Sequence, residues 1–342
     1  EKKEIRNRIV EYVDSAVDNC QFQIELPSVP NKNAMTAGML GLSYVNIYDE
    51  VDASQKNILE SGKLLSDNIL EQNLFSHSFG EDGSFSEGIL YLMWSYKFLI
   101  PYFEAREKYD GYSFYDEYPR LKESIKWIVY NMVPEGNGKT NDFNDARLSQ
   151  QPLRYHNTYL DWIIHKEKNS EYSKLGRWAW EHVFGDYSGY SDLIMNSDVL
   201  SMILWFDSDV SIENPSNYLD NSGYFSDGWY FYRTGWQDED SSDDIMFQFY
   251  SGKFYGGHNQ ADKNQYTLYE GDSYFLKDSG YSSPEYGQPY YTVSYHNLIL
   301  VNEVGQITQT SGCGSDGKID DYFYSSGLDF LIGDNSFAYN EY

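Results

Sequence analysis

The chain has 342 residues, enough for two domains with separate cores, and its 41% hydrophobic and 18% aromatic content excludes an intrinsically disordered protein. Its 53 acidic and 25 basic residues give a net charge of −28, which repels nucleic acid and anionic membrane surfaces. No apolar run reaches the roughly 18 residues of a membrane span, and Cys20 and Cys313 are too few for a disulfide framework or a cysteine metal site.

The N-terminus shows no signal peptide, because residues 1–4 open directly into an amphipathic helix. The strong acidity is typical of an extracellular or salt-tolerant protein. We therefore expect a secreted or periplasmic protein whose leader is absent from this chain.

Residues 1 to about 215 carry the periodicity of helices. Apolar side chains recur at helical spacing from Ile5 to Val17. Further helices are predicted at residues 34–48, 55–70, 87–109, 121–133, 155–165, 172–183 and 197–206. Pro101 is expected to kink or break the helix at 87–109. Helices of about 10–20 residues joined by polar loops predict an (α/α) toroid of paired helices.

The period changes after a linker at about 207–222, which contains Pro215. Short strands are predicted at residues 230–234, 245–250, 266–269, 274–277, 297–301 and 321–324. Such strands between Gly, Asp and Ser turns are typical of an antiparallel β-sandwich. We predict an α+β protein of two domains, a helical toroid at 1–216 and a β-sandwich at 217–342.

One polar stretch stands out at residues 256–265, where two glycines precede His258 and a run of amide and acid side chains. Asp278 and His296 follow, each beside strand-like sequence. Two histidines and an acid in these positions could converge on one site. On spacing alone, the alternative is that all three are ordinary loop residues.

Several motifs resemble the heparinase II/III-like polysaccharide lyases, a family that includes oligo-alginate lyases. Residues 258–262 read His-Asn-Gln-Ala-Asp where the family has His-Gly-His-Ala-Asp, and Asp-Ser-Gly at 278–280 and His-Asn at 296–297 follow in the family's order. Residues 81–91 are similar to a segment of the family's helical domain, and residues 228–236 to the strand that opens its β-domain. The resemblance implies a toroid followed by a sandwich that is incomplete at its C-terminal end.

The resemblance also implies β-elimination on a uronate-containing glycan. The proton on C5 is weakly acidic, so the adjacent carboxylate must be neutralised, a base must take the proton, and an acid must protonate O4. Tyr91 matches the family's catalytic tyrosine, and Tyr96 on the same helix is the second candidate. His258 matches the first histidine of the signature. A core aromatic is the ordinary alternative for Tyr91.

Asn33 resembles the amide that neutralises the uronate carboxylate in the family, although a helix cap is its ordinary role. Many members have a histidine after this asparagine, whereas this chain has Ala34. Lys32 or His156 is therefore the expected substitute.

The loop at 135–147 resembles a substrate-lining loop, and its Arg147 is the best local cation for an anionic sugar. Asn264 and Tyr290 are further candidates for substrate binding, Tyr290 through stacking on a sugar ring. Glu87 and Arg233 are expected to make structural contacts only.

Gln260, Asp278 and His296 stand where family members place a structural zinc ion. Because zinc prefers imidazole, thiolate and carboxylate ligands, an amide at Gln260 predicts a weakened or empty site. No organic cofactor is expected.

Three functions remain open. The first is a lyase that acts on an anionic polysaccharide or oligosaccharide, of alginate or glycosaminoglycan type. The second is a glycan-binding protein without catalysis, because the usual histidines are absent at Ala34 and Gln260. The third is an (α/α) toroid glycoside hydrolase, for which Asp82 and Glu87 are the only tempting carboxylate pair. A lyase product absorbs in the ultraviolet, and a hydrolase product does not.

Overall fold

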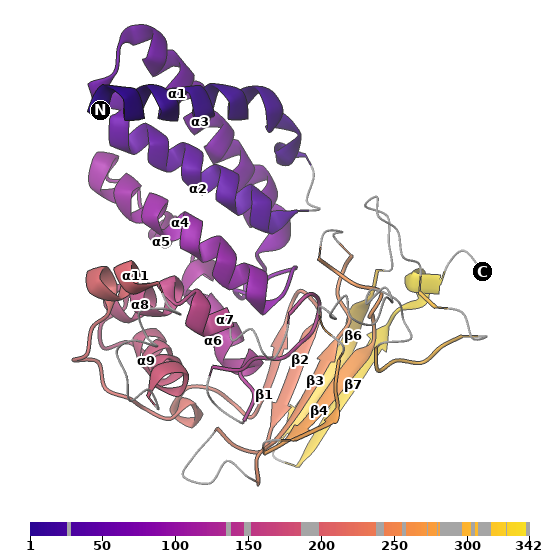
Figure 1. Cartoon of the computed structure of the whole chain (residues 1–342). Coiled ribbons are helices and arrows are strands. Elements are labelled where there is room, and N and C mark those ends of the chain that lie inside the picture. Colours follow the sequence, from indigo (N-terminus) through magenta and orange to yellow (C-terminus); the bar gives the residue numbers. More distant parts are fainter. Residues whose placement is uncertain are drawn as a thin grey trace.

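The computed structural model describes residues 1–25, 29–134, 138–146, 152–185, 198–236, 243–254, 258–271, 273–278, 280, 296–301, 305–306, 316–325 and 327–339. Helices form one half of the molecule and antiparallel strands the other (Figure 1). Helix α11 ends at Trp205 and strand β1 begins at Ser222, so the predicted domain boundary at 216/217 falls between them. None of the helices within these ranges is long and apolar enough to cross a membrane.

The helical half consists of helices that pack on their neighbours along the chain. Its α-helices are α1 (Lys2–Asn19), α2 (Pro30–Ile47), α3 (Ala53–Ile69), α4 (Ile89–Asp110), α5 (Phe114–Glu117), α6 (Arg120–Asn131), α7 (Pro152–Tyr155), α8 (Thr158–Lys166), α9 (Glu171–Phe184) and α11 (Val199–Trp205). A π-helical segment (Leu70–Ser78) follows α3. Short 3₁₀ segments lie at Gln21–Ile24, Tyr48–Glu50, Pro215–Asn217 and Ser336–Tyr339. Helix α3 begins with a capping box in which Asp52 and Gln55 satisfy free backbone N–H groups.

Helix α4 lies centrally and packs on α2, α5, α7 and α8. The approach of α2 is so close that a Cβ atom at Gly38 would lie 2.4 Å from the backbone oxygen of Phe98. The expected break at Pro101 is wrong, because α4 continues through this proline. Ile100 and Tyr102 on either side are fully buried, so packing holds the helix together at the position where one backbone hydrogen bond is lost.

The other half contains a five-stranded antiparallel sheet and a two-stranded hairpin. The sheet has the order β1 (Ser222–Phe225), β2 (Trp229–Arg233), β3 (Ile245–Tyr250), β4 (Gln265–Glu270) and β5 (Ser273–Leu276), and the hairpin is formed by β6 (Lys318–Ser325) and β7 (Leu328–Asp334). The hairpin is tied to the sheet by Asp329, whose carboxylate accepts hydrogen bonds from Ser222 and Tyr230. A cavity of about 670 Å³ with aromatic walls lies between them.

The strand predicted at residues 297–301 is wrong. Residues 297 and 298 form a bend, residues 299 and 300 have no regular structure, and Val301 is in an isolated β-bridge; Ile299 is 83% exposed. The side chain of Asn297 donates to the carbonyl groups of Tyr266 and Lys277, which fixes the bend against β4 and β5. Strands β1 and β7 were not predicted.

Residues of helix α6 make the contacts that join the sheet to the helical half. Tyr130 packs against Phe225 and Phe231, with ring centroids 5.7 Å away in both cases, and its hydroxyl donates to the carbonyl of Asp220. Trp127 meets Trp229 edge-on at 5.6 Å. These large buried contacts set the two halves in one relative position.

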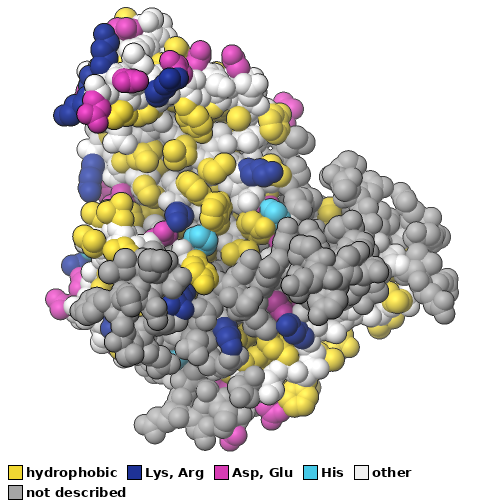
Figure 2. Space-filling view, in the orientation of Figure 1, with side chains coloured by type: hydrophobic (Ala, Val, Ile, Leu, Met, Phe, Trp, Pro, Cys, Tyr) yellow, Lys and Arg dark blue, Asp and Glu magenta, His cyan; other side chains and the backbone are white. Residues whose placement is uncertain are grey.

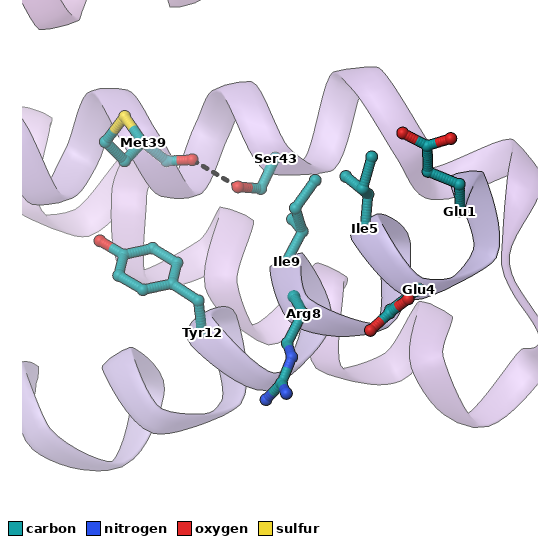
Figure 3. Close-up of a pocket in the computed structure, with 8 residues that line it drawn as sticks. All are labelled: Glu1, Glu4, Ile5, Arg8, Ile9, Tyr12, Met39 and Ser43. Carbon is teal, nitrogen blue, oxygen red and sulfur yellow. Dashed lines mark hydrogen bonds between the residues drawn. The ribbon is translucent and has the colours of Figure 1, made fainter.

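A groove of about 520 Å³ lies on the outer helices α1 and α2. Its walls come from Ile5, Ile9 and Tyr12 of α1 and from Met39 of α2 (Figure 3). These residues belong to the N-terminal part of α1 and the middle of α2, away from the first turn of α2, where Asn31 contacts Glu87, so the groove is separate from the site described next.

Candidate active site

The structure brings Tyr91 and His258 into contact. Gly88 has a φ of 85° and turns the chain into α4, which places Tyr91 in the first turn of that helix. The Tyr91 and His258 rings stack with centroids 3.8 Å apart and planes 11° from parallel, and both residues are half-buried. Tyr96 is fully buried and hydrogen-bonded to Ser124, so it belongs to the core. A phenol from the helical half and an imidazole from the strand half thus lie in contact at the junction of the two halves.

Asp145 holds His258 from the helical half. Its Oδ2 atom lies 2.5 Å from Nδ1 of His258, and its Oδ1 atom accepts a hydrogen bond of 2.7 Å from Nε2 of Gln260. The side chain of Asp145 is 5% exposed and that of His258 is 26% exposed. One carboxylate therefore binds two side chains of the strand half, and part of the imidazole stays exposed.

Glu87 is a second acid at this junction and is almost fully buried. Its carboxylate accepts a hydrogen bond of 2.8 Å from the backbone N–H of Asn31. Burial raises the pKa of Glu87 to about 8, and the negative charge of Asp145 acts in the same direction against the backbone N–H groups. Glu87 is therefore largely protonated at neutral pH and adds little negative charge beside His258.

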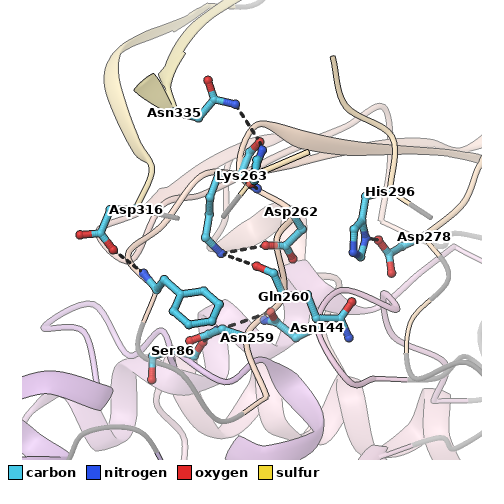
Figure 4. Close-up of polar contacts among 12 residues, drawn as sticks. Ser86, Asn144, Asn259, Gln260, Asp262, Lys263, Asp278, His296, Asp316 and Asn335 are labelled. Atoms are coloured by element: carbon cyan, nitrogen blue, oxygen red, sulfur yellow. Dashed lines mark hydrogen bonds and ion pairs between the residues drawn. The ribbon is translucent and has the colours of Figure 1, made fainter. Parts of the chain in front are cut away.

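The segment that carries His258 is fixed by its neighbours in sequence. Asn259 donates to the carbonyl of Ser86 at 2.6 Å, which ties the segment to the loop before α4. Lys263 and Asp262 form a fully buried ion pair at 2.7 Å, and Lys263 also donates to the carbonyl of Gln260 (Figure 4). These contacts hold the segment that carries His258 in one position.

Asp278 and His296 form a separate buried pair. Nδ1 of His296 lies 2.7 Å from Oδ2 of Asp278, and the other carboxylate oxygen accepts from the backbone N–H of Gly280 (Figure 4). Although burial opposes the charged form, the charge of Asp278 and its hydrogen bond raise the pKa of His296. Asp142 is buried close to Asp278, and both burial and this second carboxylate raise the pKa of Asp142.

The arrangement of Gln260, Asp278 and His296 does not fit the zinc site that the resemblance implies. Asp278 is engaged by His296 and Gly280, and the amide of Gln260 is turned toward Asp145. Gln260 Oε1 and His296 Nε2 are buried without a hydrogen-bond partner, yet an amide is a weak ligand. Across the described part of the chain, no three His, Cys, Asp or Glu side chains are placed to hold a metal ion. Bound zinc stays a prediction, and no chemical step below depends on it.

The residues predicted to neutralise the substrate carboxylate differ in access. Asn33 lies in α2, is fully buried and donates its amide to Asn73 at 3.0 Å. Lys32 beside it is exposed and close enough to Glu87 to lower the pKa of that acid. Lys32 is therefore the cation that α2 offers to a ligand at the junction.

His156 and Asn264 lie apart from the Tyr91–His258 contact. The rings of His156 and Trp94 pack edge-on with centroids 5.0 Å apart. Trp94 follows Tyr91 by about one helical turn on α4. Burial and the charge of Lys97 lower the pKa of His156 to about 4, so this histidine is neutral at working pH. Asn264 donates to the carbonyl of Gly333 and fixes β7. Arg147 and Tyr290 lie outside the described residues.

The surface around this junction differs from the acidic average of the chain. Figure 2 shows histidine side chains, together with Lys and Arg, among hydrophobic groups on the face where helices and strands meet. The acidic side chains visible in this view lie mostly toward the edges of the molecule. Among the described residues visible in this view, the histidines therefore lie beside cations and hydrophobic groups rather than in an acidic patch.

Two solved structures match this arrangement over most of the chain. A heparinase III superposes with a TM-score of 0.59 and 14% sequence identity, over 93% of this chain and 45% of its own. The heparan sulfate lyase HepC from Pedobacter heparinus superposes with a TM-score of 0.56 and 14% identity, over 89% of this chain and 41% of its own. No protein-family model and no curated protein sequence matches the chain.

The chain thus has the heparinase III fold, an α/α toroid followed by an antiparallel β-sandwich, and the predicted fold class is confirmed. It spans less than half the length of both matched structures.

Sequence reasoning missed Asp145 and assigned Glu87 a structural role only. Asp145 lies within the loop that was singled out for substrate contact, but Arg147 was preferred there because of its charge. A carboxylate among amides and glycines in that loop was the available signal. Its partner His258 lies 113 residues further along, so only the fold reveals the pair.

Proposed function

We propose that the chain is a polysaccharide lyase that cleaves a uronate-containing glycan by β-elimination. The observation that carries this proposal is the stacked pair of Tyr91 and His258 at the junction of the two halves. A phenol and an imidazole on one spot supply the proton donor and the proton acceptor that elimination needs. The lyase fold of the matched structures supports the same reaction class.

In this mechanism, His258 acts as the base through Nε2, because its Nδ1 faces Asp145. The imidazole takes the proton from C5, the C5 electron pair forms the C4–C5 double bond, and the C4–O4 bond breaks. The hydroxyl of Tyr91 gives its proton to the departing O4. The rings touch, so the sugar lies over their exposed edges rather than between them.

Substrate binding relies on cations and aromatic surface near the pair. Lys32 is proposed to face the uronate carboxylate, with Asn33 as the amide assigned by resemblance. Trp94 and His156 form a half-buried wall one turn along α4, suited to stacking on the next sugar. Arg147, Asn264 and Tyr290 remain proposed substrate contacts.

The substrate class is an anionic polysaccharide or oligosaccharide, of glycosaminoglycan or alginate type. Heparan sulfate is the first member to test, because one matched structure is a heparan sulfate lyase. A secreted or periplasmic location belongs to this proposal, since that is where a polymeric substrate is met.

The test is digestion of heparan sulfate, chondroitin, hyaluronan, alginate and ulvan, followed by ultraviolet absorbance. We expect absorbance of an unsaturated uronate to rise with at least one glycan, and to be lost in His258→Ala. New reducing ends without this absorbance would indicate a hydrolase. Binding without any product would indicate a non-catalytic glycan-binding protein. Either result contradicts the proposal.

The hydrolase alternative has weak support from the geometry. Asp82 accepts a hydrogen bond from the backbone N–H of Ser226, and Glu87 is 1% exposed. A glycosidase needs two accessible carboxylates on either side of the scissile bond. This pair does not provide them.

A further inference from the structure

We infer that Asp145 is the positioning residue of the site: it holds the proton of His258 on Nδ1, and Gln260 holds Asp145 in place. The catalytic consequence of this inference rests on the proposed function. The tautomer itself is a property of the folded chain and is independent of any substrate.

The geometry restricts both oxygens of Asp145. Oδ1 must act as an acceptor, because its partner at 2.7 Å is the amide nitrogen of Gln260. Oδ2 lies 2.5 Å from Nδ1 of His258. An ionised carboxylate only accepts hydrogen bonds, so Nδ1 carries the proton and Nε2 keeps its lone pair.

Glu87 adds little negative charge that could compete with Asp145 for the imidazole. It is 1% exposed, and burial, followed by the negative charge of Asp145, raises its pKa to about 8. The carboxylate that lies against the imidazole is therefore that of Asp145, next to the ring that becomes positive when it accepts the C5 proton.

The loop that carries Asp145 is fixed before it meets the strand half. The backbone N–H of Asn141 donates to the carbonyl of Asn131 at the end of α6. Phe143 packs edge-on against Trp229 at 5.5 Å and is fully buried. Asp145 therefore reaches the imidazole from a rigid support, as a positioning group must.

The tautomer is measured by ¹⁵N NMR of the whole chain with labelled histidine. The His258 signal is assigned as the one lost in His258→Asn among the six histidines. We expect the pattern of a neutral ring with its proton on Nδ1. In Asp145→Asn we expect this preference to be lost, because an amide can donate to Nδ1. A wild-type proton on Nε2 overturns the inference even if Asp145→Asn does not fold.

The kinetic arm uses the glycan that the wild-type protein cleaves. We expect Asp145→Asn to lower kcat by about 100-fold with KM changed less than about twofold, since the loss affects the base and not the binding surface. Asp145→Glu should recover part of kcat by restoring the carboxylate. The matched control is Asp82→Asn, which removes another carboxylate that joins the two halves, at Ser226. We expect its kcat and its His258 spectrum to stay unchanged.

The two arms separate the inference from the proposed function. Absence of turnover on every glycan contradicts the lyase proposal, and the spectrum still decides the role of Asp145. An unchanged spectrum and an unchanged kcat in Asp145→Asn overturn the inference while the lyase proposal stands. Equal losses in Asp145→Asn and Asp82→Asn also overturn it, because they indicate general loosening of the junction.

Discussion

Tyr91 is half-buried in the first turn of α4, next to the strand half of the molecule. Its ring stacks on His258, and that contact survives removal of the hydroxyl. The same helix carries Tyr96, a fully buried tyrosine whose hydroxyl is bonded to Ser124. The two side chains therefore separate chemistry from stability within one helix.

We predict that Tyr91→Phe lowers kcat by about 100-fold or more, because it removes a proton donor and keeps the ring that stacks on His258. Tyr96→Phe should keep kcat and lose about 1 kcal/mol of stability, the usual worth of one buried hydrogen bond. Ultraviolet assays and urea unfolding of both variants check this. Full activity in Tyr91→Phe would remove the phenol from the mechanism.

Gln260 is the residue at which this chain departs most from a zinc-binding pattern. We predict that Gln260→His increases zinc content relative to the wild-type protein, because an imidazole binds zinc more strongly than an amide oxygen. The measurement is metal analysis after equilibration with zinc and removal of excess. Equal zinc in both proteins would show that His296 and Asp278 are not placed to share an ion with position 260.

At the scale of elements, the segment 258–263 depends on an ion pair that water does not reach. Lys263 and Asp262 are both fully buried, and the Lys263 ammonium also lies over the Tyr250 ring at 4.5 Å. Removing one partner of such a pair leaves an uncompensated charge in the interior. A substitution in this ion pair should therefore destabilise the fold more than a substitution of His258 itself.

We predict that Lys263→Met destabilises the protein by about 3–5 kcal/mol, the usual cost of breaking a buried pair. The control Lys318→Met breaks an exposed pair with Asp320 and should cause no measurable change. Urea unfolding measures both. A small effect at Lys263 would mean that the buried pair is reached by water or replaced by other contacts.

Much of the element pattern was predictable from sequence because helices and strands have different apolar periods. Eight of the described α-helices and most strands of the large sheet follow from that pattern alone. The prediction at 297–301 is wrong because an apolar composition does not reveal whether a segment runs as an extended strand or bends at the edge of the sheet. Asp145 was missed for a related reason: its significance comes from a residue in the other half of the fold.

At the scale of the whole molecule, several acids are buried and have raised pKa values. Burial raises the pKa of Glu87 to about 8, that of Asp161 to about 7 and that of Asp227 to about 7. Between their ordinary pKa values near 4 and these raised values, the folded state binds more protons than the unfolded state. The free energy of unfolding therefore falls as pH rises through this range.

We predict that the unfolding free energy is lower at pH 8.5 than at pH 5.5 by about 2 kcal/mol or more. The net charge of −28 acts in the same direction, since self-repulsion grows as the remaining protons leave. Urea unfolding at both pH values tests this. Glu87→Gln should reduce the difference, because its amide does not titrate. A protein that is more stable at pH 8.5 would contradict the prediction.

The junction of the two halves has a consequence for recombining this protein with distant relatives. Its phenol and its carboxylate come from one half, and its imidazole and amide come from the other. A chimaera that exchanges the complete halves would preserve both cores and still lose activity if the loop at 138–146 met a foreign partner. An active chimaera should therefore need residues 138–146 and residues 258–263 from the same parent.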